Sequence, residues 1–132
     1  MKTRVLITLA GIIIFGIISI SCQHEPEPIL TIAEGTAVCF NDVLQILNNN
    51  CNIDGCHGHG EASALDNWQK IHDKYVTPYK PMQSRLHKVI TKHSNIGGLM
   101  PPKPHPSLSK YDIDIITIWI LQGAKSPAET CP

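Results

Sequence analysis

Two cysteines and a histidine form the most chemically active group in this sequence. Cys51 and Cys56 are separated by four residues, and His57 follows directly after the second cysteine. Two thiols can add across the two vinyl groups of a haem, and a histidine beside them can ligate the same iron. The usual attachment motif has two residues between the cysteines, so the loop here must bulge, and Gly55 would ease that bulge. The group is therefore a candidate attachment site for a c-type haem.

A methionine further along the chain is the candidate for the second axial ligand. Met100 stands before two prolines, which would make the ligand loop rigid. A thioether favours ferrous iron and raises the reduction potential relative to a second histidine. With both axial positions filled there would be no open site for a substrate, which indicates electron transfer rather than an enzyme. His105, five residues later in the same loop, is the main rival for this position.

Three other interpretations of these residues remain open. Cys51 and Cys56 could form a small structural disulfide. A zinc site could use both thiolates together with His57 and His59, because thiolates and imidazoles suit zinc. A haem protein could also be an enzyme or a sensor, if Met100 dissociates and opens a site for peroxide or a gas.

The composition is that of one small domain with balanced charge. The chain has 132 residues, 42% of them hydrophobic, with 11 basic and 11 acidic side chains. No long run of charge indicates a nucleic-acid partner or a polybasic patch for lipid. Ten prolines and nine glycines imply much loop, so the core would be thin unless a large group such as haem filled it.

The N-terminal segment has the layout of an export signal. Two basic residues near the start precede an apolar run over residues 5–20, and Cys22 follows the small residues Ser19 and Ser21. The run is shorter than the roughly 20 residues that cross a bilayer as a helix. We expect residues 1–21 to be a lipoprotein signal peptide and Cys22 to be lipidated. The alternatives are an uncleaved anchor and a secreted form with this cysteine free.

The residues after Cys22 indicate where the mature protein would reside. Residue 23 is Gln, so the Asp that retains many lipoproteins in the inner membrane is missing. We therefore expect an exported protein anchored by lipid to the outer membrane, on its periplasmic side or at the cell surface. Residues 22–37, with two prolines and three acidic residues, should be a flexible tether, and residues 38–132 should form the domain.

The apolar spacing predicts helices and no strand in the domain. Apolar residues recur at helical intervals in four segments, over residues 40–47, 64–75, 82–92 and 109–122. The last segment is so rich in β-branched residues that a strand is a real competitor, but its length favours a helix. Residues 93–108, with four prolines and two glycines, should be loop. The predicted fold class is all-α.

Capping residues set the expected helix ends. Asn48 to Asn50 should end the first helix before Cys51. Ser63 can cap the second helix, with Asp66 three residues later. Ser109 and Asp112 make the same pattern before the last helix, and Gly123 should end it.

The order of these features resembles that of small c-type cytochromes. A helix led by a phenylalanine, the Cys-x4-Cys-His motif, Ser84-Arg85-Leu86, Met-Pro-Pro and a final Trp-Ile-x-x-Gly-Ala follow one another over about residues 38–131. The chain looks most like the lipoprotein cytochromes of Bacteroidetes-type bacteria, which are related to planctomycete-type cytochrome c domains. This resemblance implies the cytochrome c fold, in which the terminal helices cross around one covalently bound haem.

The resemblance also implies roles for single residues. By position it assigns Cys51 and Cys56 as the haem thioethers, His57 as the proximal ligand and Met100 as the distal ligand. The other ring nitrogen of His57 should donate to a backbone carbonyl, for which the proline-rich loop is a candidate. The partners would be redox proteins, with membrane contact through the N-terminal lipid and no nucleic acid.

Two further assignments concern residues outside this motif. Cys39 and Cys131 flank the terminal helices, which are neighbours in the cytochrome c fold, so in an oxidising compartment these cysteines are expected to pair. Three polar residues can either bind a haem propionate or remain in solvent: Tyr79, Arg85 and Lys103. The two tryptophans, Trp68 and Trp119, should pack in the core or against the haem.

Overall fold

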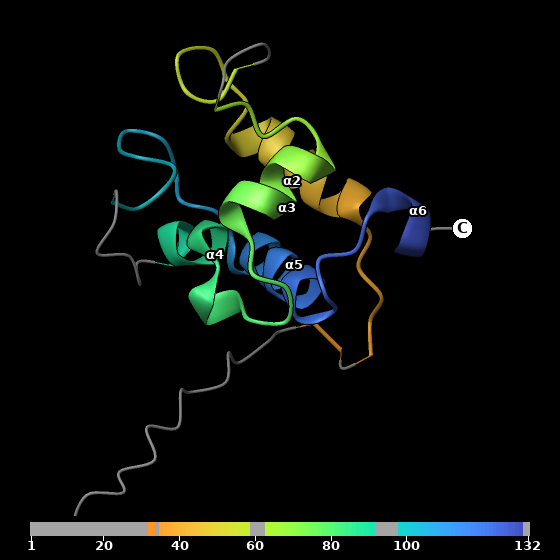
Figure 1. The fold of residues 1–132 in the computed structure, drawn as a ribbon. Coiled ribbons are helices and arrows are strands. Elements are labelled where there is room, and N and C mark those ends of the chain that lie inside the picture. The colour runs from red at the N-terminus through yellow and green to blue at the C-terminus, as the bar shows by residue number, and fades with distance from the viewer. Residues whose placement is uncertain (1–31, 34, 59–62, 92–97, 131–132) are drawn as a thin grey trace, which may run out of the picture.

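The structure is a computed structural model that describes residues 32–33, 35–58, 63–91 and 98–130. Within these ranges the chain is helical and has no strand, so the all-α prediction is confirmed (Figure 1). The elements in chain order are α2 (Phe40–Asn50), α3 (Trp68–Tyr75), the 3-10 turn η1 (Pro81–Gln83), α4 (Arg85–Ile90), α5 (Lys110–Leu121) and α6 (Pro127–Thr130).

The expected signal peptide lies outside the described residues. The same is true of Cys22 and of most of the expected tether, so export, lipidation and the domain boundaries stay predictions. Among the helices that the structure describes, none is both long enough and apolar enough to cross a bilayer.

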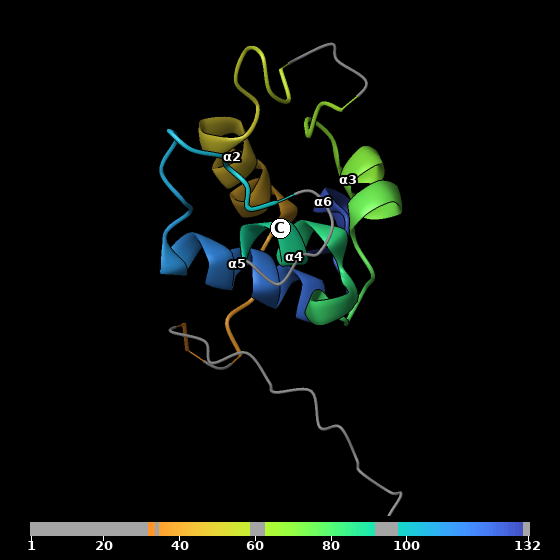
Figure 2. The ribbon, with the colours of Figure 1, turned by 90° about the vertical axis from the view of Figure 1, so that its left-hand side faces the viewer.

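Two aromatic residues join the first and last long helices at the centre of the core. Phe40 in α2 and Trp119 in α5 are almost fully buried, and their ring centroids lie 5.7 Å apart. The two helices run in different directions, so that α2 crosses α5 instead of lying along it (Figure 2). Phe40 is the first residue of α2, and the apolar spacing that predicted this helix is confirmed, since Val43 and Leu47 are also buried.

The segment with two competing interpretations is the helix α5. Seven consecutive residues, 114–120, are buried, and a helix that is covered on all sides needs no polar face. The predicted caps are present: the Ser109 hydroxyl accepts the Asp112 backbone N–H at 3.1 Å, and Gly123 follows the helix with a φ of +95°. A glycine tolerates that left-handed conformation, which ends the helix.

The second predicted helix starts later than the sequence indicated. α3 begins at Trp68, and the cap is Asn67, whose side chain accepts the Lys70 backbone N–H at 3.0 Å. Ser63 is therefore not the cap. The physical reason lies at Leu65, whose backbone N–H and carbonyl both bind the side chain of Asn52, at 2.9 and 2.8 Å. These groups are not available to a helix.

The third predicted helix is interrupted at Ser84. This residue is fully buried, and its hydroxyl accepts the Thr77 backbone N–H at 2.9 Å and lies 3.0 Å from the Lys80 carbonyl. Its extended backbone separates η1 from α4. A serine that binds the preceding loop in this way competes with continuation of the helix. The predicted end near residue 92 lies outside the described residues, and α4 itself ends at Ile90.

The burial of residues 114–120 in α5 predicts a large difference between two truncations on the same helix. Ile116 is fully buried, whereas Tyr111 is 62% exposed. Ile116→Ala should lower the free energy of unfolding by about 2–5 kcal/mol, because it leaves a cavity. Tyr111→Ala should change it by no more than about 0.5 kcal/mol. Urea unfolding followed by circular dichroism measures both, and equal losses would contradict the described packing.

Candidate functional site

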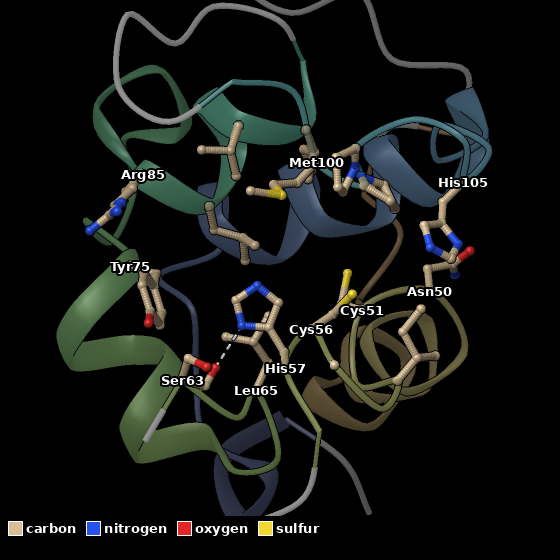
Figure 3. A pocket seen from close by; sticks show the side chains of 17 residues that line it. Asn50, Cys51, Cys56, His57, Ser63, Leu65, Tyr75, Arg85, Met100 and His105 are labelled. Atoms are coloured by element: carbon tan, nitrogen blue, oxygen red, sulfur yellow. Dashed lines mark hydrogen bonds between the residues drawn. The ribbon is translucent and has the colours of Figure 1, made fainter. Parts of the chain in front are cut away.

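A cavity of about 450 Å³ lies between the loop that follows α2 and the opposite wall formed by α4 and residues 98–109, here called the Met100 loop. Its lining includes all four residues that the sequence assigned to the haem: Cys51, Cys56, His57 and Met100 (Figure 3). The volume falls within the roughly 300–1,000 Å³ that is usual for ligand pockets. Residues nearly fifty positions apart in the sequence are thus brought to one cavity.

The walls of the cavity are mostly apolar. Leu86, Val89 and Ile90 come from α4, while Leu65 precedes α3 and Pro101 follows Met100. Such walls favour a largely apolar ligand and reduce its contact with water.

The loop that carries the two cysteines is a compact turn. The Cys56 backbone N–H donates to the Ile53 carbonyl at 3.0 Å, and the His57 N–H donates to the Cys51 carbonyl at 3.3 Å. Gly55 has a φ of +80°, in the left-handed region that favours glycine. The expectation that this glycine eases the bulge is confirmed, and the wider spacing of the cysteines is absorbed locally.

Both cysteines of the motif are free thiols, so no disulfide joins them in this structure. Cys51 is 7% exposed and Cys56 is half-buried. Burial, and secondarily the neighbouring Cys56, raise the pKa of the Cys51 thiol to about 11. Cys51 is therefore protonated at neutral pH.

A hydrogen bond orients the ring of His57. Its Nδ1 lies 2.8 Å from the Ser63 carbonyl. Because a carbonyl only accepts, Nδ1 carries the hydrogen, and the neutral ring keeps its lone pair on Nε2. The expected donation to a backbone carbonyl is confirmed, although the carbonyl belongs to the segment before α3 and not to the proline-rich loop. Figure 3 shows the second ring nitrogen pointing into the cavity toward the side where Met100 lies.

Met100 is attached to the wall opposite His57. Its backbone N–H donates to the Val89 carbonyl at the end of α4, at 2.8 Å, and Figure 3 shows its sulfur extending into the cavity. His105 also lines the cavity, but it is exposed, and in this view its ring lies beside Asn50, away from His57. The two candidates for the distal position thus belong to the same loop, with the methionine placed deeper.

One positive side chain stands at the cavity, at the end away from the cysteines (Figure 3). Arg85 is the only Lys or Arg among the described lining residues, and none of them is Asp or Glu. The guanidinium carbon lies 5.8 Å from the centroid of the Tyr75 ring, a distance at which a cation is attracted to the face of an aromatic ring. This arrangement suits a ligand with an anionic end. Tyr79 and Lys103 do not line the cavity.

The remaining predicted site residues are only partly described. Cys39 is disulfide-bonded, while Cys131, its expected partner, lies outside the described residues, so the pairing stays a prediction. His59, the fourth ligand of the zinc alternative, also lies outside them. Within the ranges that the structure describes, no three or more His, Cys, Asp or Glu residues gather in a way that could hold a metal ion.

Comparison with known proteins adds no assignment. No family model, no curated protein and no solved structure matches this chain significantly. Any account of its function therefore depends on its own residues and their arrangement.

Two residues of the site were not identified from the sequence. Asn52, inside the Cys-x4-Cys loop, is buried and binds both backbone groups of Leu65, and it also donates to the Asn48 side chain at 2.7 Å. Ser63 contributes only its backbone carbonyl. The signal for Asn52 was its position between the cysteines, whereas a carbonyl acceptor has no sequence signal at all. Asn52 connects the cysteine loop to the segment that orients His57.

This connection predicts a local effect of removing the Asn52 side chain. Asn52→Ala leaves the buried backbone N–H and carbonyl of Leu65 without their partner, and should lower the free energy of unfolding by about 1–3 kcal/mol. The Leu65 amide should also exchange its hydrogen faster. Asn49→Ala, at an exposed position near the end of the preceding helix α2, is the matched control. Hydrogen-exchange NMR checks both, and a Leu65 amide equally protected in the two variants would contradict the proposed connection.

Proposed function

We propose that this chain is an exported monohaem c-type cytochrome that carries single electrons between redox partners. One observation supports this most strongly. The Nε2 atom of His57, fixed by the Nδ1 hydrogen bond to Ser63, faces the side of an apolar cavity where Met100 lies, and two free thiols stand at the edge of the same cavity.

Each residue would hold the haem in a different way. Cys51 and Cys56 would form thioethers, which prevent loss of the group. His57 would bind the iron through Nε2, and the Ser63 carbonyl would keep the ring in the required tautomer and orientation. Met100 would occupy the other axial position through its sulfur. When bound, the haem supplies an iron that is oxidised and reduced by one electron.

The cavity fits such a group chemically. Its apolar walls suit the porphyrin ring. A haem in the cavity would add apolar contacts to a small domain that has many loops and therefore a thin core. The two propionates of a haem lie on the edge opposite the vinyl groups. Arg85, which lies at the end of the cavity away from the cysteines, would bind them with charge-assisted hydrogen bonds.

The fold and location proposed are those of a lipid-anchored member of the cytochrome c fold. The crossing of α2 and α5, with Phe40 against Trp119, supports this fold. The proposed anchor is lipidated Cys22 in the outer membrane, and a bridge between Cys39 and Cys131 would connect the two ends of the domain. Two filled axial positions leave no open site, so we propose a carrier and not an enzyme.

Replacing the distal ligand tests the axial pair. Met100→Ala should abolish the weak red charge-transfer band that accompanies methionine ligation in ferric haem. The potential should fall by on the order of 0.1 V, within the range of roughly 0.8 V that axial ligands span, because a ligand that favours ferrous iron is lost. Absorption spectra and a redox titration measure both effects. The open position should also bind cyanide and raise peroxidase activity.

His105→Ala is the matched control, because His105 lines the same cavity from the same loop. It should leave the band and the potential unchanged. If Met100→Ala left the band and the potential unchanged and His105→Ala altered them, the distal ligand would be His105 and not Met100. High-spin spectra in the unaltered protein would favour the enzyme or sensor alternative.

Single replacements of the cysteines test the covalent attachment. Cys51→Ala and Cys56→Ala should each leave one thioether, so that one vinyl group stays conjugated with the porphyrin and the pyridine haemochrome band moves to longer wavelength. Ser63→Ala, which retains the backbone carbonyl, should leave that band in place. If the cysteine variants had the band of the unaltered protein, these thiols would not be the attachment points.

A further inference from the structure

The charges of this neutral chain are strongly segregated along the sequence. Residues 74–111 contain seven Lys or Arg residues and no Asp or Glu, whereas residues 23–73 contain eight acidic residues and one lysine. Segregation on this scale creates a local electrostatic potential that the net charge does not reveal.

The basic segment forms one wall of the cavity. It supplies η1, α4 and the Met100 loop, and its residues Arg85, Met100 and His105 line the cavity, while the loop over residues 50–57 lines the other side. The hydrogen bond from the Met100 N–H to the Val89 carbonyl keeps α4 and the Met100 loop together. In Figures 1 and 2 these elements lie on the same side of the molecule. We call η1, α4 and the Met100 loop, with Lys80 next to η1, the basic rim.

The positive side chains of the basic rim are not neutralised by acidic neighbours. Elsewhere Lys70 pairs with Asp66 and Lys110 with Asp114, at 3.0 and 2.9 Å. In the described part of the chain, no ion pair connects the rim residues Lys80, Arg85, Lys88 and Lys103 to an acidic side chain. All but the half-buried Lys88 are exposed. The charge of Lys80, Lys88 and Lys103 is therefore available to an external partner, while Arg85 is the residue proposed above to bind the haem propionates.

The chemistry of the basic rim favours a protein partner over a lipid surface. A helix that binds a membrane surface turns large apolar side chains outward to the lipid. In α4 the apolar residues Leu86 and Ile90 are buried. The exposed large apolar side chains among the described residues are two tyrosines, Tyr79 and Tyr111, and tyrosine is common at protein interfaces.

We propose that the basic rim is the docking surface for a redox partner whose contact face is acidic. The redox character of the partner rests on the proposed function, but the acidic character of its face rests only on the charges described above. Docking here would bring the partner to the mouth of the cavity. Opposite charges would also accelerate the encounter at low salt.

Two charge reversals of equal size test this proposal. Lys103→Glu alters the basic rim in the Met100 loop. Lys125→Glu changes the net charge by the same amount, but in the segment between α5 and α6, none of whose residues lines the cavity. The probe is ferricyanide, a trianion that takes one electron from the reduced full-length protein and becomes ferrocyanide. Stopped-flow absorbance gives the second-order rate constant at several salt concentrations.

The rate with ferricyanide should fall about threefold or more in Lys103→Glu at low salt, and by less than about 1.5-fold in Lys125→Glu, because steering depends on charge near the site of transfer. The difference should vanish at high salt. A cationic cobalt(III) phenanthroline complex should show the reverse effect of Lys103→Glu. Equal rates in the two variants would overturn the proposal.

A second experiment, an NMR titration, does not depend on haem. It therefore distinguishes failure of the proposed docking surface from failure of the proposed function. A poly-glutamate peptide should shift the NMR amide signals of the basic rim at low salt, more weakly in Lys103→Glu than in Lys125→Glu. If the protein held no haem but showed these shifts, the cytochrome assignment would be refuted, whereas the proposal of a partner with an acidic contact face would stand. If phosphatidylglycerol vesicles shifted the same signals and the peptide did not, the partner would be a membrane and the proposal would be wrong.

Discussion

The hydrogen bond between the His57 ring and the Ser63 carbonyl sets the chemistry of the site, because it determines which nitrogen faces the cavity. The bond is possible only because residues 63–65 do not join α3. Asn52 holds Leu65 by both backbone groups, and Asn52 itself follows Cys51 in the motif loop. The loop that carries the thiols thus also positions the acceptor that orients the histidine. A change in this loop would affect the proposed haem attachment and the proposed axial ligation together.

The elements that the sequence predicted well are those determined locally. The α2 and α5 helices follow from apolar spacing and from caps next to them in the chain, as with Ser109 and Gly123. The failures come from hydrogen bonds between polar side chains and backbone groups elsewhere in the chain. The start of α3 was missed because Asn52 binds Leu65 thirteen positions away, and the break at Ser84 was missed because its hydroxyl binds the loop around Thr77 and Lys80. Spacing patterns contain no information about such bonds.

The candidate site shows the same contrast between residues that have a sequence signal and groups that have none. Side chains with distinctive chemistry, the two cysteines, His57 and Met100, could be selected from the sequence, and the structure brings all four to one cavity. The supporting groups were harder to select, since the Ser63 acceptor is a backbone carbonyl, and the sequence offered three candidates for the propionates, of which only Arg85 lines the cavity. The separation of charge that defines the basic rim is visible in the sequence, but its relation to the cavity depends on how α4 and the Met100 loop fold together.

Covalent attachment of haem through the Cys51 and Cys56 thiols is the central claim, because axial ligation, electron transfer and the redox partner all depend on it. Acid–acetone extraction of protein produced together with haem-maturation machinery tests it most directly. We expect the haem to stay with the precipitated polypeptide, and the intact mass of that polypeptide to exceed the sequence mass by one haem. Complete transfer of the haem into the acetone phase, leaving a polypeptide of unmodified mass, would contradict the claim.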